Sequence, residues 1–153
     1  MSKAIAASGS SSDRSTKVGA VIANSDGEVL AMGANSFPAG VSSLPDGRHQ
    51  RPNKYLWIEH AERNAIYAAA KSGIACDRGI MYLPWFPCAE CARAIIQSGI
   101  RGLVAFPPKL DDLKWGESFN ASLTMLEEAG VTVTFLDPET FGPEKIPSSL
   151  RSD

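Results

Sequence analysis

EHAERNAIYAAAK, residues 59–71, is an alanine-rich stretch that predicts a helix of about three turns. His60 and Glu62 place two reactive side chains at the N-terminus of this otherwise largely apolar helix. In a regular helix, residues two positions apart face opposite sides, about 200° from each other. The two side chains can converge only if the helix begins at residue 60 or 61, and the sequence therefore predicts a start there.

A second helix is predicted over residues 88–98, directly after Pro87, because proline is favoured in the first turn of a helix. Cys88 and Cys91 are three positions apart, so their sulfurs share one helix face and can bind the same ion. Together with the imidazole of His60 they make three protein ligands for Zn²⁺. Three protein ligands leave the fourth tetrahedral position to water, which is typical of a catalytic zinc.

Glu62 supplies the remaining chemical group of this site. Zinc lowers the pKa of a bound water molecule from about 15.7 to ~7. A carboxylate beside that water can take its proton and return it to a nitrogen of the substrate. The N-termini of the two helices add partial positive charge, which favours the thiolates.

Other interpretations of these residues stay open at this stage. A Cys-x-x-Cys pair alone is common in structural zinc knuckles and in redox sites, and His49 or Cys76 could supply a fourth ligand that closes the metal site. A redox pair would leave His60 and Glu62 without a role. A structural zinc site has no use for a buried carboxylate beside the metal.

The rest of the chain alternates strands and helices. Apolar β-branched runs predict strands, glycines end the helices, and an Asn-Ser-Asp-Gly turn joins the first two strands. A hairpin followed by strand–helix alternation indicates an α/β fold with a five-stranded mixed sheet flanked by helices. The predicted strands are 18–23, 28–35, 79–83, 103–106 and 131–136, and the predicted helices are 3–8, 60–72, 88–98 and 117–129.

Residues 36–55 contain no predicted element and carry three prolines and two glycines. Loops of this length are uncommon in compact domains and are often functional. The 153 residues suit one domain, which we expect over residues 1–137, with a proline-rich tail over 138–153.

Composition narrows the range of partners and compartments. The chain is 21% charged with a net charge of −2, which argues against broad binding to nucleic acids or membranes. It has no apolar run near the ~20 residues of a membrane span, and its N-terminus is too polar for a secretory signal. We therefore expect a cytoplasmic protein, in which a Cys-x-x-Cys pair favours metal or redox chemistry over a structural disulfide.

The two halves of the site together match a known signature. His60-Ala61-Glu62 followed by Pro87-Cys88-Ala89-Glu90-Cys91 fits the His-x-Glu and Pro-Cys-x-x-Cys pattern of zinc nucleobase deaminases. Over residues 3–136 the chain resembles the cytidine and deoxycytidylate deaminase superfamily, and most closely the deoxycytidylate (dCMP) deaminases. Residues 14–20 (RSTKVGA) and 35–40 (NSFPAG) are similar to the first-strand entry and the Asn-Gly-x-Pro-x-Gly loop of that family.

The sequence also departs from the family in three places, the first of which is a shortened N-terminal helix. Ser36 stands where the family loop usually has glycine, and residues 107–112 differ from a region that usually helps to build the nucleotide pocket.

The resemblance implies a three-layer α-β-α cytidine-deaminase-like fold and the zinc-dependent hydrolysis of dCMP to dUMP and ammonia. It implies that His60, Cys88 and Cys91 bind zinc and that Glu62 is the proton shuttle. It also implies a homo-oligomer, either a dimer or a hexamer. The implied substrate contacts are the Asn35 side chain to the sugar, the backbone of Ala61 and Phe86 to the base edge, and Trp85 against the ring, with Pro87 beside them.

The substrate itself leaves alternatives. A monophosphate requires cationic donors, and Arg48, Arg51 and Lys54 in the 36–55 loop are the candidates for that role. Core packing is the alternative role for Trp85 and Phe86. A free base such as guanine, or another amino-heterocycle, is the alternative substrate, and a non-catalytic zinc-stabilised module is the alternative to an enzyme.

Overall fold

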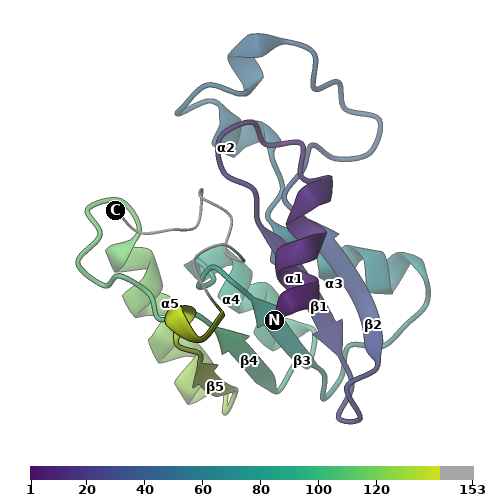
Figure 1. Cartoon of the computed structure of the whole chain (residues 1–153), viewed down its shortest axis with the longest axis vertical. Coiled ribbons are helices and arrows are strands. Elements are labelled where there is room, and N and C mark those ends of the chain that lie inside the picture. Colours follow the sequence, from purple (N-terminus) through teal and green to yellow (C-terminus); the bar gives the residue numbers. More distant parts are fainter. Residues whose placement is uncertain (142–153) are drawn as a thin grey trace.

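Five strands form one mixed sheet in the computed structural model of the chain, which describes residues 1–141 (Figure 1). Their order across the sheet is β2-β1-β3-β4-β5. β1 runs antiparallel to β2 and β3, whereas β3, β4 and β5 are parallel. The strands are β1 (Gly19–Ala23), β2 (Val29–Ala34), β3 (Ile80–Leu83), β4 (Gly102–Ala105) and β5 (Thr132–Phe135).

Parallel neighbours require crossover connections, which helices α4 and α5 supply. All the predicted strands and helices are present, with ends that differ from the predicted bounds by a few residues at most. The helix α2 and three short 3-10 helices were not predicted. The helices are α1 (Ser2–Ala7), α2 (Lys54–Trp57), α3 (Ala61–Lys71), α4 (Ala89–Gln97) and α5 (Gly116–Glu128), and the 3-10 helices are η1 (Ser8–Ser10), η2 (Asp46–Arg48) and η3 (Pro138–Phe141).

Two strand glycines let helices approach the sheet closely. A Cβ on Gly19 would lie 2.2 Å from the carbonyl oxygen of Ala4 in α1, and a Cβ on Gly33 would lie 2.3 Å from the amide nitrogen of Ala65 in α3. Gly33 pairs with Ala20, the neighbour of Gly19, so the two glycines face opposite sides of the sheet. α1 therefore covers one face and α3 the other, which confirms the predicted three-layer fold.

The main core lies between the sheet and the layer of α3, α4 and α5. Alternate residues of the central strands point into this layer, where they meet the apolar faces of the helices. The fully buried members of this core include Ile22, Met81, Leu83, Ile95, Leu103 and Leu126.

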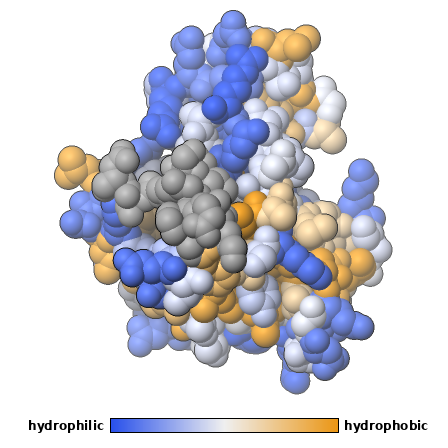
Figure 2. All heavy atoms as spheres, in the orientation of Figure 1, coloured by the Kyte–Doolittle hydropathy of each residue, from blue (hydrophilic) through white to orange (hydrophobic). Residues whose placement is uncertain are grey.

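The predicted long loop is closed at its base. Ser36 and Glu59 form an isolated antiparallel bridge, with hydrogen bonds of 3.0 and 2.8 Å between their backbones. Residues 37–58, which we call the excursion loop, extend from this bridge beyond the end of the sheet (Figure 1). Its surface is mainly hydrophilic, although large apolar side chains such as Leu44 and Leu56 are exposed on it (Figure 2).

The predicted proline-rich tail begins with a short 3-10 helix. Pro138–Phe141 forms η3, and the rings of Phe141 and Phe106 are 5.8 Å apart. The rest of that tail lies outside the described residues. Within residues 1–141, no helix has both the length and the apolar character needed to cross a membrane.

Candidate metal centre and active-site pocket

Both helices of the site begin where the sequence predicts. α3 begins at Ala61, and its N-cap His60 has an extended backbone with φ −76° and ψ 153°. α4 begins at Ala89, and its N-cap Cys88 is likewise extended, with φ −70° and ψ 167°. His60 is therefore not part of the helix, so its side chain is not held on the face opposite to Glu62 and the two side chains can converge.

His60, Cys88 and Cys91 form a cluster whose candidate ligand atoms all lie within 4.8 Å of one another. The Nδ1 atom of His60 is 3.6 Å from the Sγ of Cys88 and 3.4 Å from the Sγ of Cys91. In a tetrahedral site with zinc–sulfur bonds of ~2.3 Å and zinc–nitrogen bonds of ~2.0 Å, nitrogen and sulfur are roughly 3.5 Å apart. The two observed nitrogen–sulfur separations fit Zn²⁺ bound between these side chains.

The three groups also share protons in a way that suits a metal site. The hydrogen bond with Cys91 is the largest cause that lowers the pKa of Cys88 to about 4. The hydrogen bond with Cys88 raises the pKa of His60 to about 9 and is also the main reason that the pKa of Cys91 is raised. A divalent cation would displace the protons that gather around the Cys88 thiolate.

Glu62 lies in the first turn of α3 and is 5% exposed. Burial is the largest cause that raises the pKa of this carboxyl group above its ordinary value, and the neighbouring His60 opposes the shift. A carboxyl group in such an environment can hold a proton and release it, as a general acid and base must.

Neither of the other candidate ligands closes the metal site. The Nε2 atom of His49 lies 2.7 Å from the carbonyl oxygen of Ser43, and its ring packs edge-on against Phe37. Cys76 is buried, as expected of a small core residue, and it too is absent from the metal-binding cluster found among the described residues. Three protein ligands agree with a catalytic rather than a structural zinc site.

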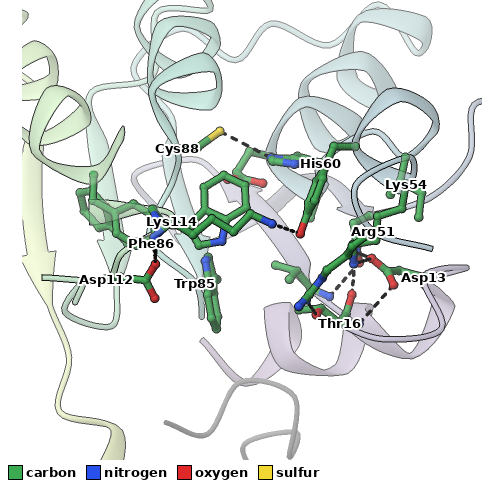
Figure 3. Close-up of a pocket in the computed structure, with 18 residues that line it drawn as sticks. Asp13, Thr16, Arg51, Lys54, His60, Trp85, Phe86, Cys88, Asp112 and Lys114 are labelled. Carbon is green, nitrogen blue, oxygen red and sulfur yellow. Dashed lines mark hydrogen bonds and ion pairs between the residues drawn. The ribbon is translucent and has the colours of Figure 1, made fainter. Parts of the chain in front are cut away.

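His60, Glu62 and Cys88 line a pocket with a volume of about 300 Å³ (Figure 3). This volume suits a small molecule such as a nucleotide base with its sugar. The predicted substrate residues Asn35, Ala61, Trp85 and Phe86 also line the pocket, and the fully buried Pro87 is not among the lining residues.

The side chain of Phe86 packs into the core, with ring centroids 5.8 Å from Phe119 and 5.9 Å from Phe135. Trp85 is only partly buried and lies along the pocket (Figure 3). Trp85, the residue predicted to lie against the substrate ring, therefore has side-chain surface to offer a ligand, whereas the side chain of Phe86 does not.

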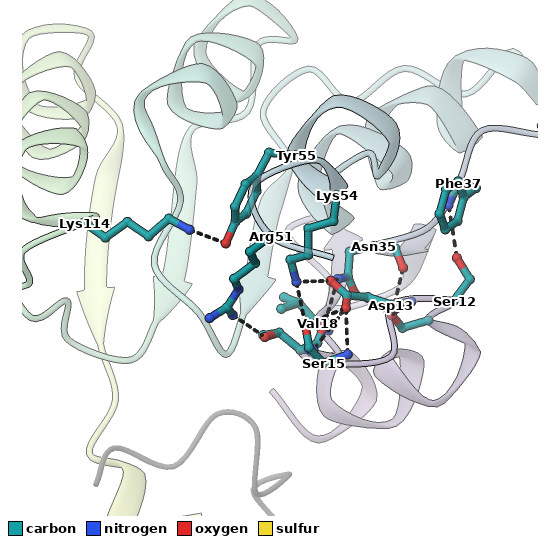
Figure 4. A network of polar contacts seen from close by, with 12 residues as sticks. Ser12, Asp13, Ser15, Val18, Asn35, Phe37, Arg51, Lys54, Tyr55 and Lys114 are labelled. Atoms are coloured by element: carbon teal, nitrogen blue, oxygen red, sulfur yellow. Dashed lines mark hydrogen bonds and ion pairs between the residues drawn. The ribbon is translucent and has the colours of Figure 1, made fainter. Parts of the chain in front are cut away.

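Asn35 is engaged in the protein itself (Figure 4). Its Oδ1 accepts hydrogen bonds from the Ser11 hydroxyl at 2.7 Å and from the Val18 amide at 2.8 Å. Its Nδ2 donates to the carbonyl oxygen of Thr16 at 2.7 Å and to Asp13 at 3.3 Å. The amide thereby ties residues 11–18 to the end of β2, and a contact with a sugar would have to share these hydrogen bonds.

Comparison with known proteins places this site in a family. Residues 1–106 match the family model of the cytidine and deoxycytidylate deaminase zinc-binding region. The chain belongs to this family. It is thus a zinc-dependent deaminase, and His60, Cys88 and Cys91 are the residues whose geometry fits the zinc.

Individual relatives agree with this membership. A protein described as an "uncharacterized deaminase in luxG 3'region" of Aliivibrio fischeri is 41% identical over 128 residues, which are 82% of this chain and 83% of the relative. The deoxycytidylate deaminase of Mus musculus is 35% identical over 135 residues, which are 84% and 72% of the two chains. The dCMP deaminase of cyanophage S-TIM5, solved in complex with dCMP and dUMP, has a TM-score of 0.70 at 27% identity, over 88% of this chain and 91% of that one.

The deaminase pocket brings together only some of the predicted phosphate-binding residues. Arg51 lines the pocket, and its guanidinium lies 3.5 Å from the hydroxyl of Thr16. Lys54 also lines it, but its ammonium is 2.6 Å from a carboxylate oxygen of Asp13. Arg48 is not among the lining residues, and its guanidinium stacks 3.9 Å from the ring centre of Trp57.

Sequence reasoning missed one wall of the pocket. The pocket is also lined by Tyr55, from α2, and by Lys114 and Trp115, just before α5. Lys114 donates a hydrogen bond to the hydroxyl of Tyr55, and the Trp115 ring is edge-on to His60 with centroids 6.3 Å apart. The only sequence signal for this wall was its position directly after the divergent residues 107–112, of which Asp112 lines the pocket.

Proposed function

We propose that this protein hydrolyses dCMP to dUMP and ammonia. The observation that carries the proposal is a single pocket that is lined by a buried carboxyl group, by residues of the zinc-binding cluster and by two cationic side chains. Glu62 is the carboxyl group, and Arg51 and Lys114 are the cations. A relative named deoxycytidylate deaminase and a similar dCMP deaminase solved in complex with dCMP and dUMP add support.

Zinc bound to the cluster supplies a Lewis acid that activates the attacking water molecule. Glu62 takes a proton from that water as it attacks C4 of cytosine. The same carboxyl group delivers that proton to N3 of the ring. It then takes a second proton from the new hydroxyl group on C4 and passes it to the departing amine, so water and the cytosine nucleotide yield a uracil nucleotide and ammonia. The raised pKa of Glu62 helps, because the protonated form must persist long enough to donate.

The aromatic side chains of the pocket hold the base. Trp85 offers its partly exposed ring to one face of the pyrimidine, and Trp115 closes the side next to His60. The backbone of Ala61 and Phe86 supplies hydrogen-bonding groups to the base edge. Aromatic walls of this kind exclude water from the reacting atoms and orient the ring by stacking.

The phosphate is bound by Arg51 and Lys114. Both side chains line the pocket, and they come from segments 63 residues apart in sequence that meet across it (Figures 3 and 4). Neither has a carboxylate partner among the ion pairs found in residues 1–141. Hydrogen bonds between cations and phosphate oxygens are stronger than neutral ones, so these residues would distinguish a nucleotide from a nucleoside.

The direct test is ammonia release by purified, zinc-loaded protein. The substrates are dCMP, CMP, deoxycytidine, cytosine, guanine and adenosine, each over a range of concentrations. We expect the highest kcat/KM for dCMP and a much lower value for deoxycytidine, which lacks the phosphate.

Turnover of a free base with none on dCMP would overturn the substrate assignment while it leaves Glu62 and the metal cluster in their roles. A complete lack of turnover on every substrate by zinc-loaded protein would instead favour a non-catalytic module. The comparisons favour neither of these alternatives.

We also propose that the protein acts in the cytoplasm as a homo-oligomer, either a dimer or a hexamer. Reduced cysteines are needed as ligands, and the cytosol keeps thiols reduced. Leu56 and Leu113 are largely or fully exposed and belong to the two segments that form the pocket walls, which gives an apolar surface for association. Light scattering after size-exclusion chromatography would give the molar mass, and a mass near 16.3 kDa would exclude the oligomer.

A further inference from the structure

A buried ion pair joins two of the segments that line the pocket. The ammonium of Lys54, in the excursion loop, lies 2.6 Å from Asp13, and the two side chains are only 5% and 4% exposed. Both residues line the pocket. The pair is therefore part of the pocket wall and not a surface contact.

The surroundings of the pair satisfy its charges. The Oδ1 atom of Asp13 accepts hydrogen bonds from the amides of Ser15 and Thr16 at 2.8 and 3.2 Å. Lys54 donates a second hydrogen bond to the hydroxyl of Ser15 at 2.7 Å, and Asn35 donates to the same Asp13 oxygen that Lys54 contacts (Figure 4). Burial of two charges is costly, and the hydrogen bonds that Asp13 and Lys54 receive and donate here offset that cost.

Lys54 also fixes the position of its neighbours in the chain. Its amide donates to the carbonyl oxygen of Gln50 at 2.8 Å, which closes a turn around Arg51. Arg51 itself has only a 3.5 Å contact with Thr16, which is at the outer limit for a hydrogen bond. The place of Arg51 at the pocket therefore depends on the anchoring of Lys54.

We propose that the Lys54–Asp13 pair is a positioning device that fastens the excursion loop to residues 11–18 and so holds Arg51 where the substrate phosphate binds. This inference rests on the proposed function, because it assumes a phosphorylated substrate. Lys54 acts through Arg51 and the loop, and its own charge is neutralised by Asp13.

The chain contains a matched control for this pair. Arg14 and Asp46 form a 2.7 Å ion pair between the same two segments, but their side chains are 58% and 81% exposed. Exposed ion pairs contribute little, so Arg14→Met should leave the loop and the kinetics within about twofold of the wild type. The test variant is Lys54→Met, together with Asp13→Asn/Lys54→Met, which avoids a lone buried carboxylate if the single variant folds poorly.

Two measurements on zinc-loaded full-length protein decide the question. Hydrogen–deuterium exchange reports on the excursion loop without any substrate, and we expect faster exchange across it in Lys54→Met and in the double variant. Steady-state kinetics should show KM for dCMP raised at least tenfold, with kcat changed less than threefold and deoxycytidine turnover little affected.

Loop exchange equal to that of the wild type in both variants would overturn the positioning role, whatever the substrate. Faster exchange with an unchanged KM for dCMP would overturn the link to phosphate binding. If the wild-type enzyme does not prefer dCMP to deoxycytidine, the proposed substrate is wrong. The claim that the pair positions Arg51 for the substrate phosphate is then wrong as well. The exchange data then decide whether the pair fastens the loop.

Discussion

At the scale of single residues, the chemistry depends on where Glu62 sits. Its carboxyl group is buried beside the metal cluster because His60 is the last extended residue before α3 and Glu62 lies in the first turn of that helix. The cluster has three protein ligands and an acid–base group that is not one of them. Metal binding and proton transfer can therefore be separated by substitution.

Glu62→Gln keeps the shape of the side chain and removes its ability to transfer a proton. We expect kcat for dCMP to fall by about 10²–10⁴-fold, the usual contribution of general acid–base catalysis. The zinc content by elemental analysis should stay at the wild-type value. The control is Glu127→Gln, an exposed position in α5, which should leave both measurements unchanged. Loss of zinc from Glu62→Gln would contradict the division of roles.

Arg51 and Lys114 offer a second test at this scale. A hydrogen bond to a charged group contributes ~1.5–3 kcal/mol, so Arg51→Ala or Lys114→Met should raise KM for dCMP by about 10- to 100-fold. Deoxycytidine, which has no phosphate, should be turned over as by the wild type. Arg48→Ala is the matched control, because Arg48 belongs to the same loop but stacks on Trp57. An equal effect of all three substitutions would contradict a specific phosphate contact.

At the scale of elements, the position of α3 on the sheet sets the position of His60 and Glu62. Gly33 in β2 permits the close approach, since a Cβ there would also lie 2.6 Å from the carbonyl oxygen of Ala61, the first residue of the helix. Backbone atoms cannot move aside as a flexible side chain can. Any side chain at residue 33 must therefore displace the start of α3.

Gly33→Ala should destabilise the protein by ~1–3 kcal/mol, the usual cost of overpacking, and should also lower kcat because α3 carries the catalytic carboxylate. Urea unfolding and steady-state kinetics measure the two effects. Gly47→Ala is the control, because a Cβ at Gly47 would meet no atom within 4 Å. A stable, fully active Gly33→Ala variant would show that α3 can shift without consequence for the site.

The same scale shows which features the sequence could predict. His60, Glu62, Cys88 and Cys91 occupy two short motifs at helix starts, so local spacing was enough to group them. α2 has only four residues, which is too short for a periodic pattern, and Tyr55 within it was missed. Lys114 was missed for another reason, because only the tertiary fold brings the segment before α5 to the pocket.

At the scale of the whole molecule, long-range polar contacts decide how the pocket closes. Asp13 and Lys54 are 41 residues apart, and no local pattern marks either as a partner of the other. Lys54 was predicted to bind phosphate from its charge and loop position alone. The fold instead neutralises it with Asp13. Of the three cations that line the pocket, Arg51 and Lys114 are the two without a carboxylate partner among the ion pairs of the described residues.

The Asp13 pair should also make stability depend on pH. Burial acts to raise the pKa of Asp13, but the hydrogen bonds from Lys54 and from the amides of Ser15 and Thr16 outweigh it and hold that pKa below 3.8. In this acidic range the unfolded chain binds more protons than the folded protein, so stability rises with pH. The contribution is present above the unfolded pKa of 3.8 and is lost as the pH falls through the lower folded value.

Asp13→Asn removes this titration and keeps a hydrogen-bonding side chain. We expect the wild type to exceed the variant in unfolding free energy at pH 6, and the difference to shrink as the pH falls below about 4, near the ordinary aspartate value. Both proteins carry the same metal cluster, so acid release of zinc cancels in the comparison. The control is Asp46→Asn, at the exposed ion pair. Its unfolding free energy, measured in urea, should change with pH in the same way as that of the wild type. A difference between wild type and Asp13→Asn that stays constant from pH 6 to pH 3 would show that Asp13 contributes by its shape and hydrogen bonds, without its charge.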